Sequence, residues 1–193
     1  MRKQNSKKWA FMLFLVFALA VFTACDNQET EENKKDVTPQ GTEQTTYDLK
    51  LYYASYSYME SGSGNHLISY ECQLISDPDD IYIEVARALS SVPEGLDPKV
   101  YQTAFYDGLR IENVYAKDGT IFVDVSSEGL NGGSLEETLF IEQVVETYLH
   151  TFEKDGIDHV RFLVDGAEAE TLMGHWDVSQ PFGHIADGES EQQ

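Results

Sequence analysis

The chain has 193 residues, of which 34 are acidic and 13 are basic, so its net charge is −21 at pH 7. Nucleic-acid binding needs clustered Lys and Arg to neutralise phosphates, and this composition excludes it. The chain contains two cysteines, Cys25 and Cys72.

The first 25 residues have the organisation of an export signal. A basic start is followed by an apolar run over residues 9–24 and then by Cys25. The run of about 16 residues is shorter than the roughly 20 that a permanent membrane-spanning helix needs. Residues 22–25, Phe-Thr-Ala-Cys, look like a bacterial lipobox, although Phe22 stands where Leu is usual. We predict cleavage after Ala24 and lipidation of Cys25; the alternative is an ordinary secreted protein with a cysteine at this position.

This signal predicts that the protein is located on the extracytoplasmic face of the cell membrane. It would contact the membrane through the lipid on Cys25. Removal of residues 1–24 leaves nine basic residues against 34 acidic ones, a net charge of about −25. Such a chain is repelled by anionic headgroups, so the folded part should stand off the membrane. Residues 25–46 are polar and predict a disordered spacer. A single domain over residues 47–183 and an acidic disordered tail over 184–193 complete the expected organisation.

The first half of the domain predicts a hairpin and a helix. Apolar residues alternate with polar ones over 49–53 and again over 67–74, with a Gly/Ser loop at 61–65 between them. Asp77 is a suitable helix cap and Pro78 suits the first helical position. An apolar face then extends to Val92, before a helix stop at residues 93–95.

The second half predicts two strands, a long helix and a further strand. Strands over 109–114 and 121–125 flank Asp118-Gly119, a strong signal for a tight hairpin turn. Ser134 and Glu137 have the spacing of a capping box, and the helix that follows has one apolar stripe and ends near Gly156. A strand over 160–164 leads to a turn at 165–166, after which residues 168–173 can pair back.

The predicted order is therefore β-β-α-β-β-α-β. Each helix has one apolar stripe and each strand one apolar face. The simplest arrangement is an α+β fold, a two-layer sandwich in which two helices pack on one face of a single mixed sheet of about five strands.

Signals of catalysis are weak. The chain has no phosphate loop, nucleophile elbow or zinc-ligand spacing. Cys72 lies in an alternating strand pattern and is expected to point into the core as a small hydrophobe. One hypothesis is a metal-assisted hydrolase site built on His175, Asp177 and His184. The favoured interpretation is that these residues belong to a structured C-terminal loop. Acidic residues at 77–80 suggest calcium, but helix capping already explains them.

Tyrosines gather near the start of the domain, at positions 52, 53, 56 and 58. Aromatic residues at strand spacing most often form core and cross-strand pairs. An exposed row could instead stack on sugars or on a protein, because tyrosine joins a flat apolar face to a polar tip. We therefore take Tyr52, Tyr56 and Tyr58 as candidate ligand or partner contacts.

Several segments of the chain resemble the GerMN domain. The segments that carry the resemblance are residues 123–128, 143–149, 160–166, 170–175 and 177–181, with a looser match over 88–96. The resemblance covers about residues 47–182. It implies a compact α/β domain of Gram-positive cell-envelope lipoproteins, some tied to sporulation and spore germination, with a fold similar to ring-building envelope modules. It supplies no catalytic residues.

Anchor, spacer and resemblance together predict a non-enzymatic envelope lipoprotein whose domain contacts another envelope protein. Self-association is left open, and we predict no cofactor and no metal. The alternatives are a glycan- or solute-binding lipoprotein that uses the Tyr-rich strand, and the hydrolase built on His175, Asp177 and His184.

Overall fold

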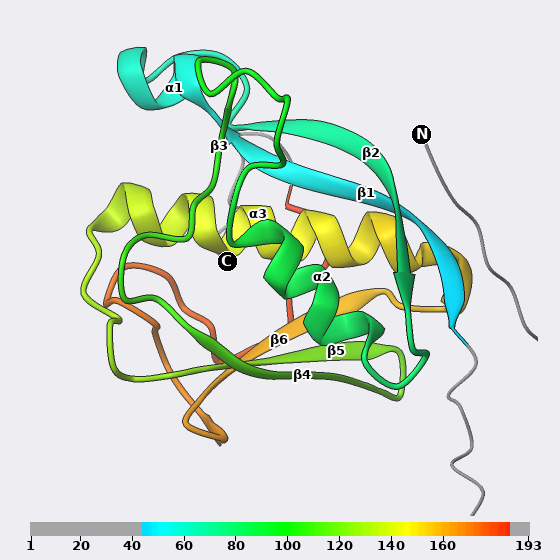
Figure 1. Ribbon diagram of the computed structural model, residues 1–193. Helices are drawn as coiled ribbons and strands as arrows, with labels where there is room; N and C mark the ends of the chain where they lie inside the picture. The colour runs from blue at the N-terminus through cyan, green and yellow to red at the C-terminus, as the bar shows by residue number, and fades with distance from the viewer. Residues whose placement is uncertain (1–43, 186–193) are drawn as a thin grey trace, which may run out of the picture. The chain divides into compact units, whose positions relative to one another are not determined.

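The structure is a computed structural model, and it describes residues 44–185 (Figure 1). Cys25, the signal segment, most of the predicted spacer and the tail beyond residue 185 lie outside the described residues. The elements are β1 (Thr45–Ser55), α1 (Tyr56–Ser61), β2 (Leu67–Ser76), α2 (Ile81–Leu89), β3 (Tyr101–Gln102), β4 (Ile111–Lys117), β5 (Thr120–Val125), α3 (Ser134–Phe152), the short 3-10 helix Glu153–Asp155, β6 (His159–Val164) and β7 (Ala167–Glu168).

Within this range, no helix combines the length and apolar character that crossing a membrane requires.

The strands form two sheets. One has the order β2-β1-β3, with β1 and β2 antiparallel from Thr45↔Ser76 to Ala54↔Leu67. The other has the order β4-β5-β6-β7, in which β4 and β5 form an antiparallel hairpin and β5 and β6 run parallel. A parallel pair needs a long crossover connection, and α3 provides it between β5 and β6.

The α+β class and the mixed sheet are confirmed, but the single sheet of about five strands is replaced by two sheets. The reason lies at the second edge of β1. There the Lys50 N–H donates to Thr151 Oγ1 at 3.2 Å and the Tyr52 N–H donates to Thr147 Oγ1 at 2.9 Å. Hydroxyl groups of α3 thus occupy the edge where a strand of the other sheet would have to pair.

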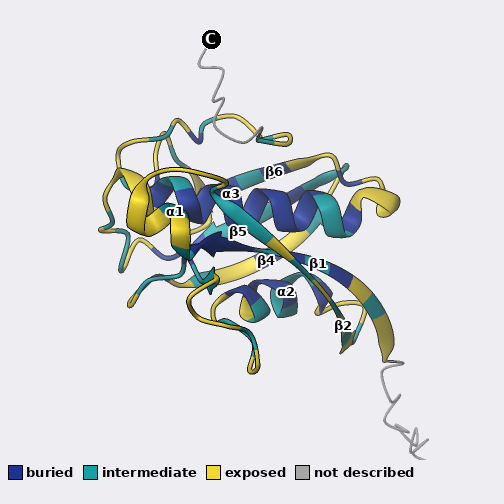
Figure 2. Ribbon diagram, turned by 90° about the horizontal axis from the view of Figure 1, so that it is seen from above, coloured by how far each residue is buried: buried dark blue, intermediate teal, exposed yellow. Residues whose placement is uncertain are grey.

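Helix α3 lies between the β1–β2 hairpin and the sheet of β4, β5 and β6 (Figures 1 and 2). Its burial is wider than the single stripe that the sequence predicts, because polar residues such as Glu137, Gln143 and Thr147 are fully buried beside the apolar ones. The core around it is formed by Leu49, Leu51 and Tyr53 from β1, Val85 and Leu89 from α2, Ile121 and Val123 from β5, and Val160 and Phe162 from β6.

The first predicted helix begins later than expected. Asp77 does not cap it; its Oδ1 accepts the Asp79 N–H at 3.1 Å within a turn, and α2 starts at Ile81. Asp80 stands at the N-cap without a side-chain hydrogen bond to the helix. The acidic run at 77–80 is therefore a turn that leads into the helix, and the capping role predicted for Asp77 is wrong.

The predicted tight turns are confirmed. Asp118 and Gly119 have φ values of 50° and 79°, and Asp165 and Gly166 have φ values of 49° and 76°. Positive φ at both central positions is the geometry that Asp-Gly supports. These turns set the β4–β5 and β6–β7 pairings.

Two loops approach each other closely at the open end of the β4–β5 hairpin, at Gly108 before β4 and at Gly129 after β5. Gly129 has φ +96°, and a Cβ placed there would lie 2.1 Å from the Gly108 carbonyl oxygen. Both the backbone conformation and the space therefore require glycine at position 129.

We predict that Gly129→Ala lowers the free energy of unfolding by roughly 3 kcal/mol or more, because it adds a backbone clash to the cost of a positive φ. Gly64→Ala is the matched control, since Gly64 has φ +97° and no atom within 4 Å of the added Cβ. The control should cost about 1 kcal/mol. Chemical denaturation measures both, and equal losses would show that the close approach contributes nothing.

Candidate functional site

The three tyrosines proposed as contacts do not form one row. Tyr52 lies on β1, whereas Tyr56 and Tyr58 belong to α1. The strand ends there because Ser55 caps the helix, accepting the Tyr58 N–H on its side chain at 3.4 Å. The strand spacing expected at positions 56 and 58 is therefore wrong, although each ring remains partly exposed.

Tyr52 already has partners within the chain. Its ring stacks on His150 of α3 with centroids 5.0 Å apart, and the Lys50 ammonium lies 5.4 Å from its centroid. Tyr58 likewise packs on the ring of His66, with centroids 4.0 Å apart. These contacts reduce the free aromatic face that stacking on a sugar would use.

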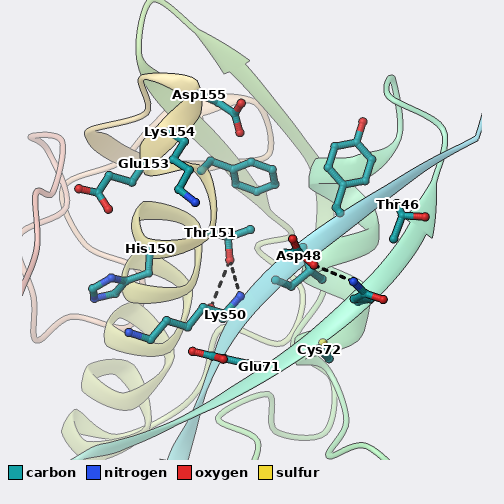
Figure 3. Close-up of a pocket in the computed structure, with 14 residues that line it drawn as sticks. Thr46, Asp48, Lys50, Glu71, Cys72, His150, Thr151, Glu153, Lys154 and Asp155 are labelled. Carbon is teal, nitrogen blue, oxygen red and sulfur yellow. Dashed lines mark hydrogen bonds between the residues drawn. The ribbon is translucent and has the colours of Figure 1, made fainter.

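A groove of about 710 Å³ lies between the β1–β2 hairpin and the C-terminal end of α3 (Figure 3). Lys50 extends into it between His150 and Glu71, and Cys72 lies at its wall (Figure 3). The pKa of Lys50 is raised, mainly by its hydrogen bond with Tyr52, so the side chain is a cation at neutral pH. The groove thus presents mixed charges.

Cys72 is not an activated thiol. It is half-buried on β2 and packs against the core, and burial raises the pKa of its thiol. A raised pKa keeps the sulfur protonated at neutral pH, whereas a nucleophile or metal ligand needs the thiolate.

A second groove of about 560 Å³ lies beside the first and shares His150 with it. Tyr52, Asn65 and Ser69 line it on the hairpin side, and Glu146 and His184 line it opposite.

Glu146, His150 and His184 form a cluster in this second groove. His184 Nδ1 lies 2.8 Å from Glu146 Oε2, and His150 Nε2 lies 3.3 Å from the same oxygen. The two imidazole rings have centroids 4.6 Å apart. Burial, assisted by the charges of Lys50 and His184, lowers the pKa of His150.

The predicted grouping of His175, Asp177 and His184 is not formed. Within residues 44–185, one group of three or more His, Cys, Asp or Glu side chains places its ligand atoms within 4.8 Å of one another, and it is Glu146, His150 and His184. His175 is exposed, and Asp177 Oδ1 accepts the Ser179 N–H at 2.9 Å. Sequence reasoning missed Glu146 and His150, although their i, i+4 spacing on a predicted helix was a usable signal.

Glu137 holds the C-terminal loop on α3. Its fully buried carboxylate accepts three backbone N–H groups: Leu172 at 3.1 Å and Met173 at 2.8 Å on Oε1, and His175 at 2.8 Å on Oε2. The capping box predicted for Ser134 and Glu137 is therefore wrong. The N-cap is Gly133, which has no side chain to bond the helix, and Glu136 Oε2 accepts the Gly133 N–H at 3.1 Å.

The C-terminal segment makes further contacts with the domain after residue 175. Trp176 Nε1 donates to Thr138 Oγ1 at 2.8 Å, and Phe182 pairs with Val160 at the outer edge of β6. The Ile185 N–H then donates to Glu146 Oε1 at 2.6 Å. His184 and Ile185, which the sequence assigns to the tail, are thus bonded to α3, and this places His184 in the cluster.

The fold and the loop define an α+β domain of the GerMN type. The structure resembles the first GerMN domain of the sporulation protein GerM from Bacillus subtilis, with 19% identity, a TM-score of 0.51, and coverage of 73% of this chain and 97% of that one. It also resembles the tandem GerMN domains of the same protein, with 15% identity, a TM-score of 0.53 and coverage of 74% of this chain; the match spans 47% of the tandem chain.

A protein described as a lipoprotein from Clostridium perfringens is 21% identical, with a TM-score of 0.47 and coverage of 72% and 87% of the two chains. No curated protein sequence matches the chain.

A family model described as "Germane: Sporulation and spore germination" matches residues 50–170, and the chain belongs to this family. The resemblance inferred from the sequence is thereby confirmed.

We predict that Glu137→Gln lowers the free energy of unfolding by about 2–3 kcal/mol, because an NH₂ group would replace one of the acceptor oxygens that face buried N–H groups. Glu136→Gln is the matched control and should cost less than about 0.5 kcal/mol, since an exposed Gln also serves at this cap position. Chemical denaturation gives both values. Limited proteolysis should show faster cleavage of the loop around residues 172–176 in Glu137→Gln alone, and equal behaviour of the two variants would refute the anchoring role.

Proposed function

We propose that this protein is a membrane-anchored lipoprotein on the extracytoplasmic face of the cell membrane, and that its Germane domain makes protein contacts rather than catalysing a reaction. The signal segment over residues 1–24, directly followed by Cys25, supports the anchor. Membership of a family described by sporulation and spore germination supports a role in the cell envelope linked to one of these processes.

The absence of enzymatic activity is part of the proposal, and the chemistry of the candidate groups supports it. Cys72 has a raised thiol pKa, and His175 and Asp177 lie apart from His184. Among the described residues, every buried side-chain nitrogen and oxygen already has a hydrogen-bond partner. The buried polar groups are thus used to hold the fold.

The open edge of β2 is the observation that carries the contact proposal. Within residues 44–185, β2 pairs with β1 alone, along Leu67–Ser76. The N–H groups of Lys50 and Tyr52 point away from β2 toward α3, so those of Leu49 and Leu51 point toward it. Their partners Cys72 and Tyr70 therefore use their N–H groups in the ladder, and Glu71 and Gln73 direct theirs outward.

A row of outward N–H and C=O groups is a template for an added strand. Ile75 stands near the end of this strand with 64% of its surface exposed, the largest value among the exposed large hydrophobic residues. An extended segment of a partner, or a second copy of the chain, fits this edge.

We predict that Cys25→Ser moves the protein from the membrane fraction to the soluble fraction or the medium, because the lipid on Cys25 is the anchor. Cys72→Ser is the control, since it also removes a sulfur but from a side chain within the domain. Fractionation followed by immunoblotting measures both. Membrane retention of Cys25→Ser equal to that of the unchanged protein would contradict the anchor.

We predict that the protein with a photo-crosslinking amino acid at position 75, expressed in its native host cells, gives a discrete crosslinked product. The same group at Met59, an exposed apolar residue on α1, should not give that product. Gln73→Pro removes an outward N–H and leaves the β1–β2 backbone bonds in place, although it also removes the bond from Gln73 Nε2 to Asp48 Oδ1 at 2.8 Å, so it should abolish the product from position 75. Circular dichroism checks that the fold is retained.

Identical products from positions 75 and 59, or a product at 75 that Gln73→Pro leaves unchanged, would argue against strand addition at β2.

A further inference from the structure

The acid–histidine cluster on α3 has the composition of a metal site. Glu146 and His150 stand one turn apart on α3, and His184 reaches the same point from the C-terminal segment. We propose that Glu146, His150 and His184 bind a divalent transition-metal ion, with Zn²⁺ as the best fit.

The distances match those between ligands of one ion. Zn–N and Zn–O bonds of 2.0–2.1 Å in tetrahedral geometry place neighbouring ligand atoms about 3.3 Å apart. Glu146 Oε2 lies 3.3 Å from His150 Nε2 and 2.8 Å from His184 Nδ1, and all three ligand atoms lie within 4.8 Å of one another. His184, whose side chain is 53% exposed, is the ligand that can move to bring the three atoms around one ion.

The ligands are also held in orientation by their neighbours. Glu146 is 7% exposed, and its other oxygen accepts the Ile185 N–H at 2.6 Å, so Oε2 remains directed at the two imidazoles. Tyr52 stacks on His150 and fixes the ring plane. Such supporting contacts around first ligands are typical of metal sites in proteins.

The ligand set selects the kind of metal. Two imidazole nitrogens and one carboxylate suit Zn²⁺ and similar ions, whereas Ca²⁺ takes six to eight oxygens and Mg²⁺ prefers oxygen and water. The strongly acidic chain attracts cations in general. Lys50 is a nearby positive charge that would repel a metal ion, and its ammonium group lies over the Tyr52 ring.

The site leaves a fourth position open. Its ligands line the groove of about 560 Å³, so a water molecule or a side chain of a partner has access to the ion. The ion would also join α3 to His184, and thereby fix the end of the C-terminal segment. This site does not depend on which partner the β2 edge binds, so the two proposals stand or fall separately.

The test is titration of the full chain, purified without a polyhistidine tag and dialysed against a chelator, with ZnCl₂ and in parallel with CaCl₂ and MgCl₂. Calorimetry should show one Zn²⁺ per chain, with no comparable binding of the other two ions. Co²⁺ should give the visible absorption of a four-coordinate site. Thermal unfolding should shift upward when Zn²⁺ is added.

Two variants of the ligands and one matched control separate this site from adventitious binding. His184→Ala removes a mostly exposed ligand and should weaken Zn²⁺ binding by roughly tenfold or more. His159→Ala is the matched control, because His159 is also exposed and pairs with a carboxylate, Asp158 at 2.6 Å, without belonging to the cluster. Glu146→Gln keeps the size of the side chain but removes its negative charge, and it should weaken Zn²⁺ binding as His184→Ala does.

Loss confined to His184→Ala and Glu146→Gln, with His159→Ala unchanged, supports the site. No Zn²⁺ binding by the unchanged chain, or equal affinity in His184→Ala and the unchanged chain, overturns the proposal. His184→Ala is expected to fold, and its unfolding temperature without metal checks this.

Discussion

The covering of α3 on nearly all sides is the constraint on which the rest of the structure depends. A buried polar side chain without a partner costs several kcal/mol when it is charged, so each one on this helix must be paired. The partners come from distant parts of the chain: the loop at 172–175 for Glu137, His66 for Glu142, the Ala104 N–H and Leu89 carbonyl for Gln143, Ile185 for Glu146 and the Tyr52 N–H for Thr147. One helix therefore organises the hairpin, the long connection after α2 and the C-terminal segment.

The same pairing explains why the side chains that could bind a ligand or a metal ion lie close together. Thr147 and Thr151 accept the free N–H groups of β1, which brings β1 against the C-terminal half of α3. Tyr52 is thereby stacked on His150, and Glu146 on the next face of the helix receives His184 and Ile185. The opposite edge of the hairpin, along β2, has no such cover within residues 44–185. Closing one edge of β1 with the helix leaves β2 as the open edge of the β2-β1-β3 sheet among the described residues.

Local patterns in the sequence predicted local structure well and distant pairing poorly. The Asp-Gly turns and the parallel-strand segment at 160–164 depend on neighbouring residues, and the structure has them. The division into two sheets depends on Thr147 meeting β1, which no periodicity reveals. Glu137 was misread for a related reason: its spacing from Ser134 fits a capping box, but its carboxylate is used by a loop 35 residues away. The cluster of Glu146, His150 and His184 could not be predicted from local patterns either, because His184 reaches Glu146 only through that loop.

The anchor and the open edge constrain where a partner can be. About 20 residues separate Cys25 from the start of β1 at Thr45, and a fully extended chain of that length spans at most about 70 Å. Lipidation at Cys25, as proposed, would therefore keep the β2 edge within roughly that distance plus the size of one domain from the membrane. The acidic chain is repelled by anionic headgroups, so the accessible partners are those that themselves extend from the membrane or the envelope. A strand-adding contact in that zone gains from the high effective concentration that tethering provides, so it needs only a modest intrinsic affinity.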